Sequence, residues 1–216
     1  LVAPGTYTEN INYDGKNIVV RSQNGPSVTK IIPSVSMQPI ADFNNSETSQ
    51  ALLSGFSLSK GGALRGSGIR ISGANPTIEN VIIDNCELTN TAHGAISFHS
   101  TQAIIKNSVI HSTSGGPAIY IDNAGDNSTI INCTIADNYI GIDASDRPIN
   151  VKNSIIYNNT TPLKGYGFIA AEYSDIEGGY TGVGNIDSAP FFIDASNGDY
   201  HLSNYSPSIG AGTSSG

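Results

Sequence analysis

Short apolar segments recur at nearly regular intervals through the middle of the chain. In four of them, an apolar residue lies two positions before an asparagine and a second apolar residue lies three positions after it. The four asparagines, which are 27, 25 and 21 residues apart, are Asn80, Asn107, Asn132 and Asn153. A repeat of about 20–50 residues is typical of solenoid proteins, in which each unit packs only against its neighbours.

Each repeat divides into three short strands and shows no helical periodicity. Polar and apolar residues alternate in the first strand, the second strand ends at the asparagine, and the third follows it. First strands are expected at residues 68–72, 95–99, 118–122 and 141–145, and third strands at 81–83, 108–110, 133–135 and 154–156. Three strands per turn predict an all-β fold, a right-handed parallel β-helix with rungs about 4.8 Å apart.

The repeated asparagine has a structural interpretation. A sharp bend between two strands requires left-handed dihedral angles, which Asn tolerates better than other non-glycine residues. Gly55 occupies this place in an earlier copy, and Tyr173 lies near it in a degenerate later copy. We therefore expect the four asparagines to form an internal ladder, with buried amides that bond from rung to rung.

The repeat also suggests how the chain is divided. We expect one β-helix domain over residues 1–216, with irregular N-terminal rungs at 1–68, regular rungs at 69–157, and a last rung plus a surface-packed tail at 158–216. Leu1 and Val2 already resemble the body of a strand. Since an open strand edge promotes aggregation, a preceding domain or end-to-end self-association is expected to cover the N-terminal rung.

The outward positions of the third strands form an apolar stripe that requires cover. The stripe consists of Ile82, Val109, Thr134 and Ile155. The tail is expected to cover it with Phe191, Phe192, Ile193 and Leu202.

Composition excludes several classes of function. Charged residues make up 13% of the chain, the net charge is −8, and the basic residues are scattered. Nucleic acids and anionic membranes are therefore not expected partners. No apolar run reaches the roughly 18 residues of a membrane-spanning helix, so no membrane insertion is expected. Many Asn, Ser, Thr and Gly residues with few Lys residues favour a secreted or cell-surface bacterial protein.

The two cysteines are expected to remain free. Cys133 follows a repeat asparagine and points inward, whereas Cys86 lies two rungs earlier at another point of the turn. Two rungs correspond to about 9.6 Å, which is beyond the reach of a disulfide bond. We predict two buried thiols.

Several segments resemble one broad family. Residues 2–11, Val-Ala-Pro-Gly-Thr-Tyr-Thr-Glu-Asn-Ile, resemble the opening of secreted bacterial right-handed parallel β-helix repeat proteins of the pectate-lyase-like superfamily, and are also similar to the start of pectin methylesterases. Residues 184–192, Gly-Asn-Ile-Asp-Ser-Ala-Pro-Phe-Phe, resemble the tail of the same group. The resemblance implies the fold but no single activity, because members include polysaccharide lyases, epimerases, esterases and adhesin-like surface proteins.

The outward positions of the first strands carry the candidate chemistry. Stacked by rung, one column contains Arg70, Ser97, Tyr120 and Asp143, and the next contains Ser72, His99, Asp122 and Ser145. His99, Tyr120 and Asp122 are candidate catalytic residues, since a carboxylate beside a histidine orients it for general acid–base work. The resemblance implies that polysaccharide lies on this face.

Two binding roles complete the candidate site. Arg70 and Asp143 are candidate substrate-binding residues, with Arg70 suited to a uronate carboxylate. Asp122, Asp143 and Asp146 could supply oxygen ligands to calcium, the one cofactor that the sequence suggests.

Three functions remain open at this point. The first is an extracellular module that binds polysaccharide or forms part of a larger surface protein. The second is a polysaccharide lyase or related carbohydrate-active enzyme that acts on a uronate polymer at the first-strand face. The third is an architectural spacer whose outward residues are only a solvated surface. Pectin methylesterase activity is disfavoured, because after Gln50 the chain contains Gln102 alone instead of the expected glutamines.

Overall fold

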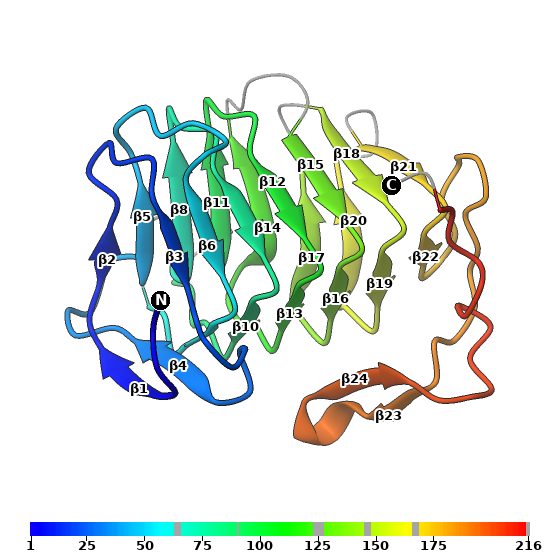
Figure 1. Ribbon diagram of the computed structural model, residues 1–216. Helices are drawn as coiled ribbons and strands as arrows, with labels where there is room; N and C mark the ends of the chain where they lie inside the picture. The colour runs from blue at the N-terminus through cyan, green and yellow to red at the C-terminus, as the bar shows by residue number, and fades with distance from the viewer. Residues whose placement is uncertain (63–65, 90, 123–127, 145–147, 166–168, 215–216) are drawn as a thin grey trace.

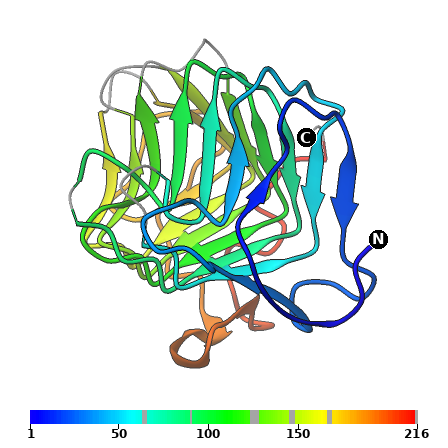
Figure 2. The same cartoon turned by 90° about the vertical axis from the view of Figure 1, so that its left-hand side faces the viewer.

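Three parallel sheets wind around a common axis, and each rung adds one strand to each sheet (Figure 1). This computed structural model describes residues 1–216 except 63–65, 90, 123–127, 145–147, 166–168 and 215–216. Figure 2 views the coil from its N-terminal side, where the strands of the first rungs lie in front. The arrangement is the parallel β-helix that the repeat predicts.

The strands alternate strictly among the three sheets. The first sheet contains β2 (Ile11–Asn12), β5 (Ala41–Phe43), β8 (Ile69–Ser72), β11 (Ile96–His99), β14 (Pro117–Asp122), β17 (Ile140–Asp143) and β20 (Thr161–Lys164). The second contains β3 (Val19–Arg21), β6 (Leu52–Ser54), β9 (Thr77–Glu79), β12 (Ile104–Lys106), β15 (Ser128–Ile131), β18 (Ile149–Lys152) and β21 (Ile169–Glu172). The third contains β1 (Gly5–Thr8), β4 (Thr29–Ile32), β7 (Ser57–Ser59), β10 (Ile82–Asp84), β13 (Val109–His111), β16 (Thr134–Ala136), β19 (Ile155–Tyr157) and β22 (Asp175–Ile176).

A single column of apolar side chains fills the interior of the coil. One cluster of buried hydrophobic residues extends from Tyr13 to Ile176. Its largest members include Phe43, Phe56 and Phe98, which are at most 1% exposed. Burying one such side chain stabilises a fold by about 1.5–3 kcal/mol, so the core is the main source of stability.

The repeat asparagines form the predicted bends but not the predicted internal ladder. Asn80, Asn107, Asn132 and Asn153 have φ between 51° and 53°, which confirms the left-handed conformation. The first three are exposed and the fourth is partly buried, so the expectation of buried amides is wrong. The physical reason is that these corners direct the side chain outward. Nδ2 of Asn132 still donates to Oδ1 of Asn107 at 3.1 Å, as an exposed contact between neighbouring rungs.

The internal ladder is built at the following corner by two other asparagines. Asn138 and Asn159 are 3% and 6% exposed, and each lies six residues after a repeat asparagine. Oδ1 of Asn138 accepts from the backbone N–H of Thr113 at 3.0 Å, and Nδ2 donates to the carbonyls of Ile110 at 3.0 Å and Ala136 at 2.9 Å. Asn159 Oδ1 accepts from the Asn138 backbone N–H at 3.0 Å. The buried amides therefore connect three successive rungs.

Both cysteines are free and buried, as predicted. Burial raises the pKa of the Cys86 thiol to about 11 and that of Cys133 to about 12. Since the thiolate is the reactive form, neither sulfur is expected to react with a thiol reagent in the folded protein at pH 8. Titration with an aromatic disulfide should detect no thiol in native protein and two after denaturation. Rapid labelling of the native protein would contradict the buried placement.

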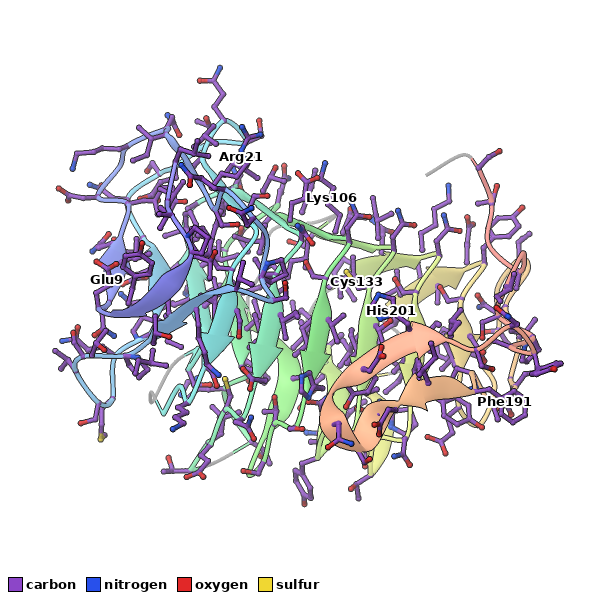
Figure 3. All side chains as sticks on the ribbon, turned by 60° about the horizontal axis from the view of Figure 1, so that its bottom comes forward. Glu9, Arg21, Lys106, Cys133, Phe191 and His201 are labelled. Carbon is purple, nitrogen blue, oxygen red and sulfur yellow. The ribbon has the colours of Figure 1, made fainter. Side chains whose placement is uncertain are left out.

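The C-terminal strap is defined here as residues 188–214, and its hairpin lies over the third sheet (Figure 3), while the residues after the hairpin run along the C-terminal end of the coil (Figure 1). It forms an antiparallel hairpin of β23 (Phe192–Asp194) and β24 (Asp199–Leu202), joined by the 3₁₀ turn Ala195–Asn197. Phe192 and Leu202 are partly buried, whereas Phe191 and Ile193 are 56% and 60% exposed. The last two do not supply the predicted cover, because alternation in the hairpin turns them to solvent.

Tyr200 anchors the strap instead. It is 8% exposed, and its hydroxyl donates to Oδ2 of Asp137 at 2.7 Å. Its ring lies 4.8 Å from that of His111 and 5.1 Å from that of Phe192, measured between centroids. Burial also lowers the pKa of His111, which is therefore a neutral packing partner at pH 7. The four residues of the apolar stripe are all partly buried.

Hydrogen bonds also attach the part of the strap that follows the hairpin to the last rungs of the coil. Asn153, the last repeat asparagine, exchanges two bonds of 2.9 Å with the backbone of Thr213. Ser208 donates to Oδ2 of Asp175 at 2.6 Å.

In the described part of the chain, no helix has the length and apolar character to cross a membrane.

Candidate functional site

The first sheet places the candidate residues in the predicted register. Cα pairing aligns Arg70 with Ser97, Ser97 with Tyr120, and Tyr120 with Asp143. In the next column, Ser72 pairs with His99 and His99 with Asp122. These adjacencies are confirmed, because parallel strands in register keep outward positions in line. The roles of the residues stay predictions.

The column is longer than predicted. Asn12 pairs with Asp42, Asp42 with Arg70, and Asp143 with Lys164. It therefore contains Asn12, Asp42, Arg70, Ser97, Tyr120, Asp143 and Lys164 in the order of the rungs. Asn12, Asp42 and Lys164 are the members that sequence reasoning missed.

A shallow pocket of about 180 Å³ opens on this sheet. It is lined by Arg70, Ser72, His93, Ser97, Phe98, His99, Tyr120 and Asp122. Pockets for drug-sized ligands measure roughly 300–1,000 Å³, so this pocket suits one small ring. Six of the lining residues come from the two predicted columns, and only His93 and Phe98 do not.

His99 and Asp122 line the pocket with side chains that are about half exposed. Nδ1 of His99 lies 3.5 Å from Oδ2 of Asp122, and the two side chains are 49% and 46% exposed. The distance is long for a hydrogen bond, yet catalytic contacts in unliganded sites are often loose. The pair can orient an imidazole for proton transfer, or offer a carboxylate acceptor beside a ring.

Two aromatic rings also line the pocket. Tyr120 and His93 meet edge to face, with ring centroids 6.1 Å apart and planes at 78°. His93 lies in the turn that precedes β11. Oγ of the buried Ser97 accepts from the backbone N–H of Gly94 at 3.0 Å, which fixes this turn against the sheet.

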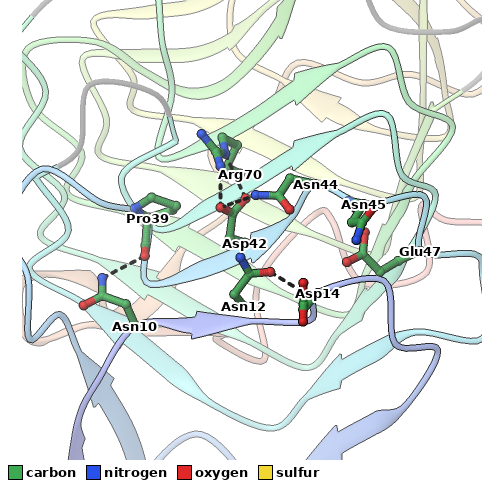
Figure 4. A network of polar contacts seen from close by, with 9 residues as sticks. All are labelled: Asn10, Asn12, Asp14, Pro39, Asp42, Asn44, Asn45, Glu47 and Arg70. Atoms are coloured by element: carbon green, nitrogen blue, oxygen red, sulfur yellow. Dashed lines mark hydrogen bonds and ion pairs between the residues drawn. The ribbon is translucent and has the colours of Figure 1, made fainter.

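Arg70 is already paired with a carboxylate (Figure 4). Its Nε donates to Oδ1 of Asp42 at 2.8 Å, and its Nη2 donates to Oδ2 of the same residue. Asn44 donates a further bond of 2.8 Å to Oδ2 of Asp42. The guanidinium that was predicted to bind a uronate thus holds a bidentate partner from the preceding rung.

Asp143 is also paired, and it does not face solvent. Its side chain is 1% exposed, and its Oδ2 accepts from Nζ of Lys164 at 2.8 Å. A carboxylate at this depth requires such a partner, because desolvation of an unpaired charge is costly. Direct contact with a ligand would therefore require Lys164 to move.

The calcium hypothesis gains no third ligand among the described residues. Asp146 lies outside them, as does Ser145. The described part of the chain contains no group of three His, Cys, Asp or Glu side chains placed to hold a metal ion. Of the other two candidate ligands, Asp143 is paired with Lys164 and Asp122 lies beside His99. Calcium binding by these residues stays a prediction.

Comparison with known proteins bears on the fold alone. No curated protein and no solved structure gives a match. A family model described as "right handed beta helix region" matches residues 12–185, which is more than half of the chain. The predicted fold is thereby confirmed, and the chain belongs to the right-handed β-helix family.

Proposed function

We propose that the protein is a polysaccharide-binding β-helix module that acts outside the cell, alone or within a larger surface protein. The observation that carries this proposal is the pocket on the first sheet, whose lining includes the Tyr120 and His93 rings and the His99–Asp122 pair. A sugar ring presents apolar C–H faces and a rim of hydroxyl groups. Aromatic walls with a few placed polar groups match both features.

The polar groups of the pocket include both a hydrogen-bond acceptor and a donor for sugar hydroxyl groups. The carboxylate of Asp122 accepts hydrogen bonds, and the guanidinium of Arg70 donates them. A sugar hydroxyl does both at once, so neighbouring hydroxyls can satisfy the two groups together. Because the pocket is open and is part of a continuous sheet, it can hold one ring of a polymer whose chain continues along the surface.

A polysaccharide lyase or related carbohydrate-active enzyme is the second candidate. It is favoured by the contact between His99 and Asp122, which would hold the imidazole as a general base. Tyr120, in the neighbouring column, would then donate a proton to the glycosidic oxygen that leaves. In this second hypothesis, the protein binds the same sugar and also cleaves the polymer.

Glycan-array binding followed by calorimetry tests the proposal. The wild-type protein is expected to retain at least one polysaccharide, and Tyr120→Ala should weaken this binding about tenfold or more, which equals about 1.4 kcal/mol. Tyr139→Ala is the matched control, since Tyr139 is a 47% exposed tyrosine outside the pocket. Equal losses in both variants, or no binding to any glycan, would exclude this site.

Turnover assays separate the two candidates. The same polymers are incubated with the protein, with and without Ca²⁺, and unsaturated products are followed by ultraviolet absorbance. Binding without product supports the module. Product formation that His99→Ala abolishes supports the enzyme.

A further inference from the structure

We infer that the pocket selects neutral glycans over uronate polymers, and that Asp42 is the residue that sets this preference. The inference rests on the proposed function, since it names the class of glycan that the same pocket takes. Asp42 lies outside the pocket lining, but its carboxylate compensates the charge of Arg70, which lines the pocket. Figure 4 shows this residue between Arg70 and Asn44.

The positive charge of Arg70 is already matched inside the protein. A free guanidinium beside a sugar would attract a uronate carboxylate through a bidentate pair. Here Nε and Nη2 already donate to the two carboxylate oxygens of Asp42. The positive charge is therefore compensated within the protein, and the remaining N–H donors are better matched to uncharged hydroxyl groups.

Asp42 is held firmly in its place beside Arg70. Its side chain is 11% exposed, and Asn44 donates a third hydrogen bond to it at 2.8 Å. Asp42 and Arg70 are also Cα partners on adjacent strands β5 and β8. A uronate would have to displace this preformed partner, or place a second carboxylate against one guanidinium. Either costs affinity that a neutral sugar does not lose.

The other charged groups near the pocket also disfavour a uronate. Lys164, the other cation of this column, is paired with Asp143. The remaining charged group at the pocket is the carboxylate of Asp122, which lies beside His99 and is 46% exposed. It repels a uronate and accepts from a hydroxyl. The net charge of −8 adds repulsion of the same sign toward polyanions.

These contacts make Asp42 a specificity-determining residue that acts through Arg70. Replacing Asp42 with asparagine keeps its shape but removes the charge that compensates the guanidinium. Arg70 would then carry an uncompensated positive charge toward the pocket. The binding module is favoured over the uronate lyase for the same reason, because the lyase would need the uronate that the wild-type pocket repels.

The test compares matched neutral and charged polymers. Polygalacturonate and its fully methyl-esterified form share one backbone and differ in charge, and neutral glucans, mannans, xylans and galactans complete the panel. Affinity electrophoresis at fixed ionic strength should show that wild-type protein is retarded by neutral polymers and not by polygalacturonate. Asp42→Asn should raise uronate binding about tenfold while neutral binding changes little. Asp14→Asn is the control, since it removes an exposed carboxylate outside the pocket.

Each outcome decides a separate point. Tighter wild-type binding to uronate than to neutral polymers, or no gain of uronate binding in Asp42→Asn, would overturn the inference and leave the glycan site in place. Absence of binding to every polymer would overturn both the inference and the proposed function. Should Asp42→Asn fail to fold, as seen by circular dichroism, Asp122→Asn replaces it, because that half-exposed residue can lose its charge without loss of packing. It should shift the preference in the same direction.

Discussion

Replacing Asn138 with alanine is expected to lower the free energy of unfolding by about 2–4 kcal/mol. The side chain serves three backbone groups, since it accepts from Thr113 and donates to the carbonyls of Ile110 and Ala136. All lie in the interior, where a buried polar group left without a partner costs about 1–3 kcal/mol. Equilibrium denaturation in urea, with circular dichroism as the probe, measures the loss.

Asn132→Gly is the matched control for this prediction. Asn132 belongs to the repeat that dominates the sequence, but it is exposed and occupies a left-handed bend with φ of 53°. Glycine adopts this conformation without strain, so the expected loss is below about 1 kcal/mol. A larger loss at Asn132 than at Asn138 would show that the repeat asparagines, and not the second set, carry the internal ladder.

The two asparagine columns show where sequence reasoning succeeds and where it stops. The spacing of the repeat asparagines predicts a solenoid and its left-handed bends, because only Gly, Asn and a few other residues tolerate such dihedral angles. The second set, Asn138 and Asn159, has the same 21-residue interval as Asn132 and Asn153. Spacing alone cannot say which column faces inward, since side-chain direction at a corner does not follow the alternation of a strand.

The candidate site divides in a similar way. The columns of β8, β11 and β14 were predictable, because alternation and a clear repeat define their outward positions. Asp42 was not, since its rung lacks the repeat asparagine and its strand could not be aligned with Arg70, 28 residues later. Lys164 did leave a signal, because it follows Asp143 by the same 21 residues that separate the last two repeat asparagines.

The missed partners change the chemistry that the site offers. From the sequence alone, Arg70 and Asp143 are exposed charges on one face, which suits an acidic substrate and a metal ion. In the structure each is neutralised by a neighbour one rung away. The paired charges thus stabilise the column, and in the proposed site a ligand would meet the two rings, the His99–Asp122 pair and the N–H donors of Arg70 that Asp42 does not occupy.

Replacing Tyr200 with alanine is expected to release the C-terminal strap while the β-helix stays folded. The substitution removes a buried ring packed on His111 and Phe192 and a hydroxyl bonded to Asp137. Truncating a buried aromatic residue to alanine costs about 3–5 kcal/mol. This loss should fall on the strap, because Tyr200 belongs to the hairpin and not to the cluster that fills the coil.

Limited proteolysis with mass spectrometry measures this release. Cleavage within residues 188–214 should accelerate by at least about a hundredfold in Tyr200→Ala, if opening of the strap becomes easier by about 3 kcal/mol. Tyr200→Phe is the control, since it keeps the ring and loses only the bond to Asp137, and its cleavage should be intermediate. Strap release should also expose the partly buried side chains of Phe192 and Leu202 and increase the binding of a hydrophobic dye. Equal protection of the strap in wild-type and Tyr200→Ala proteins would mean that the bonds of Asn153 and Asp175 hold it without the anchor.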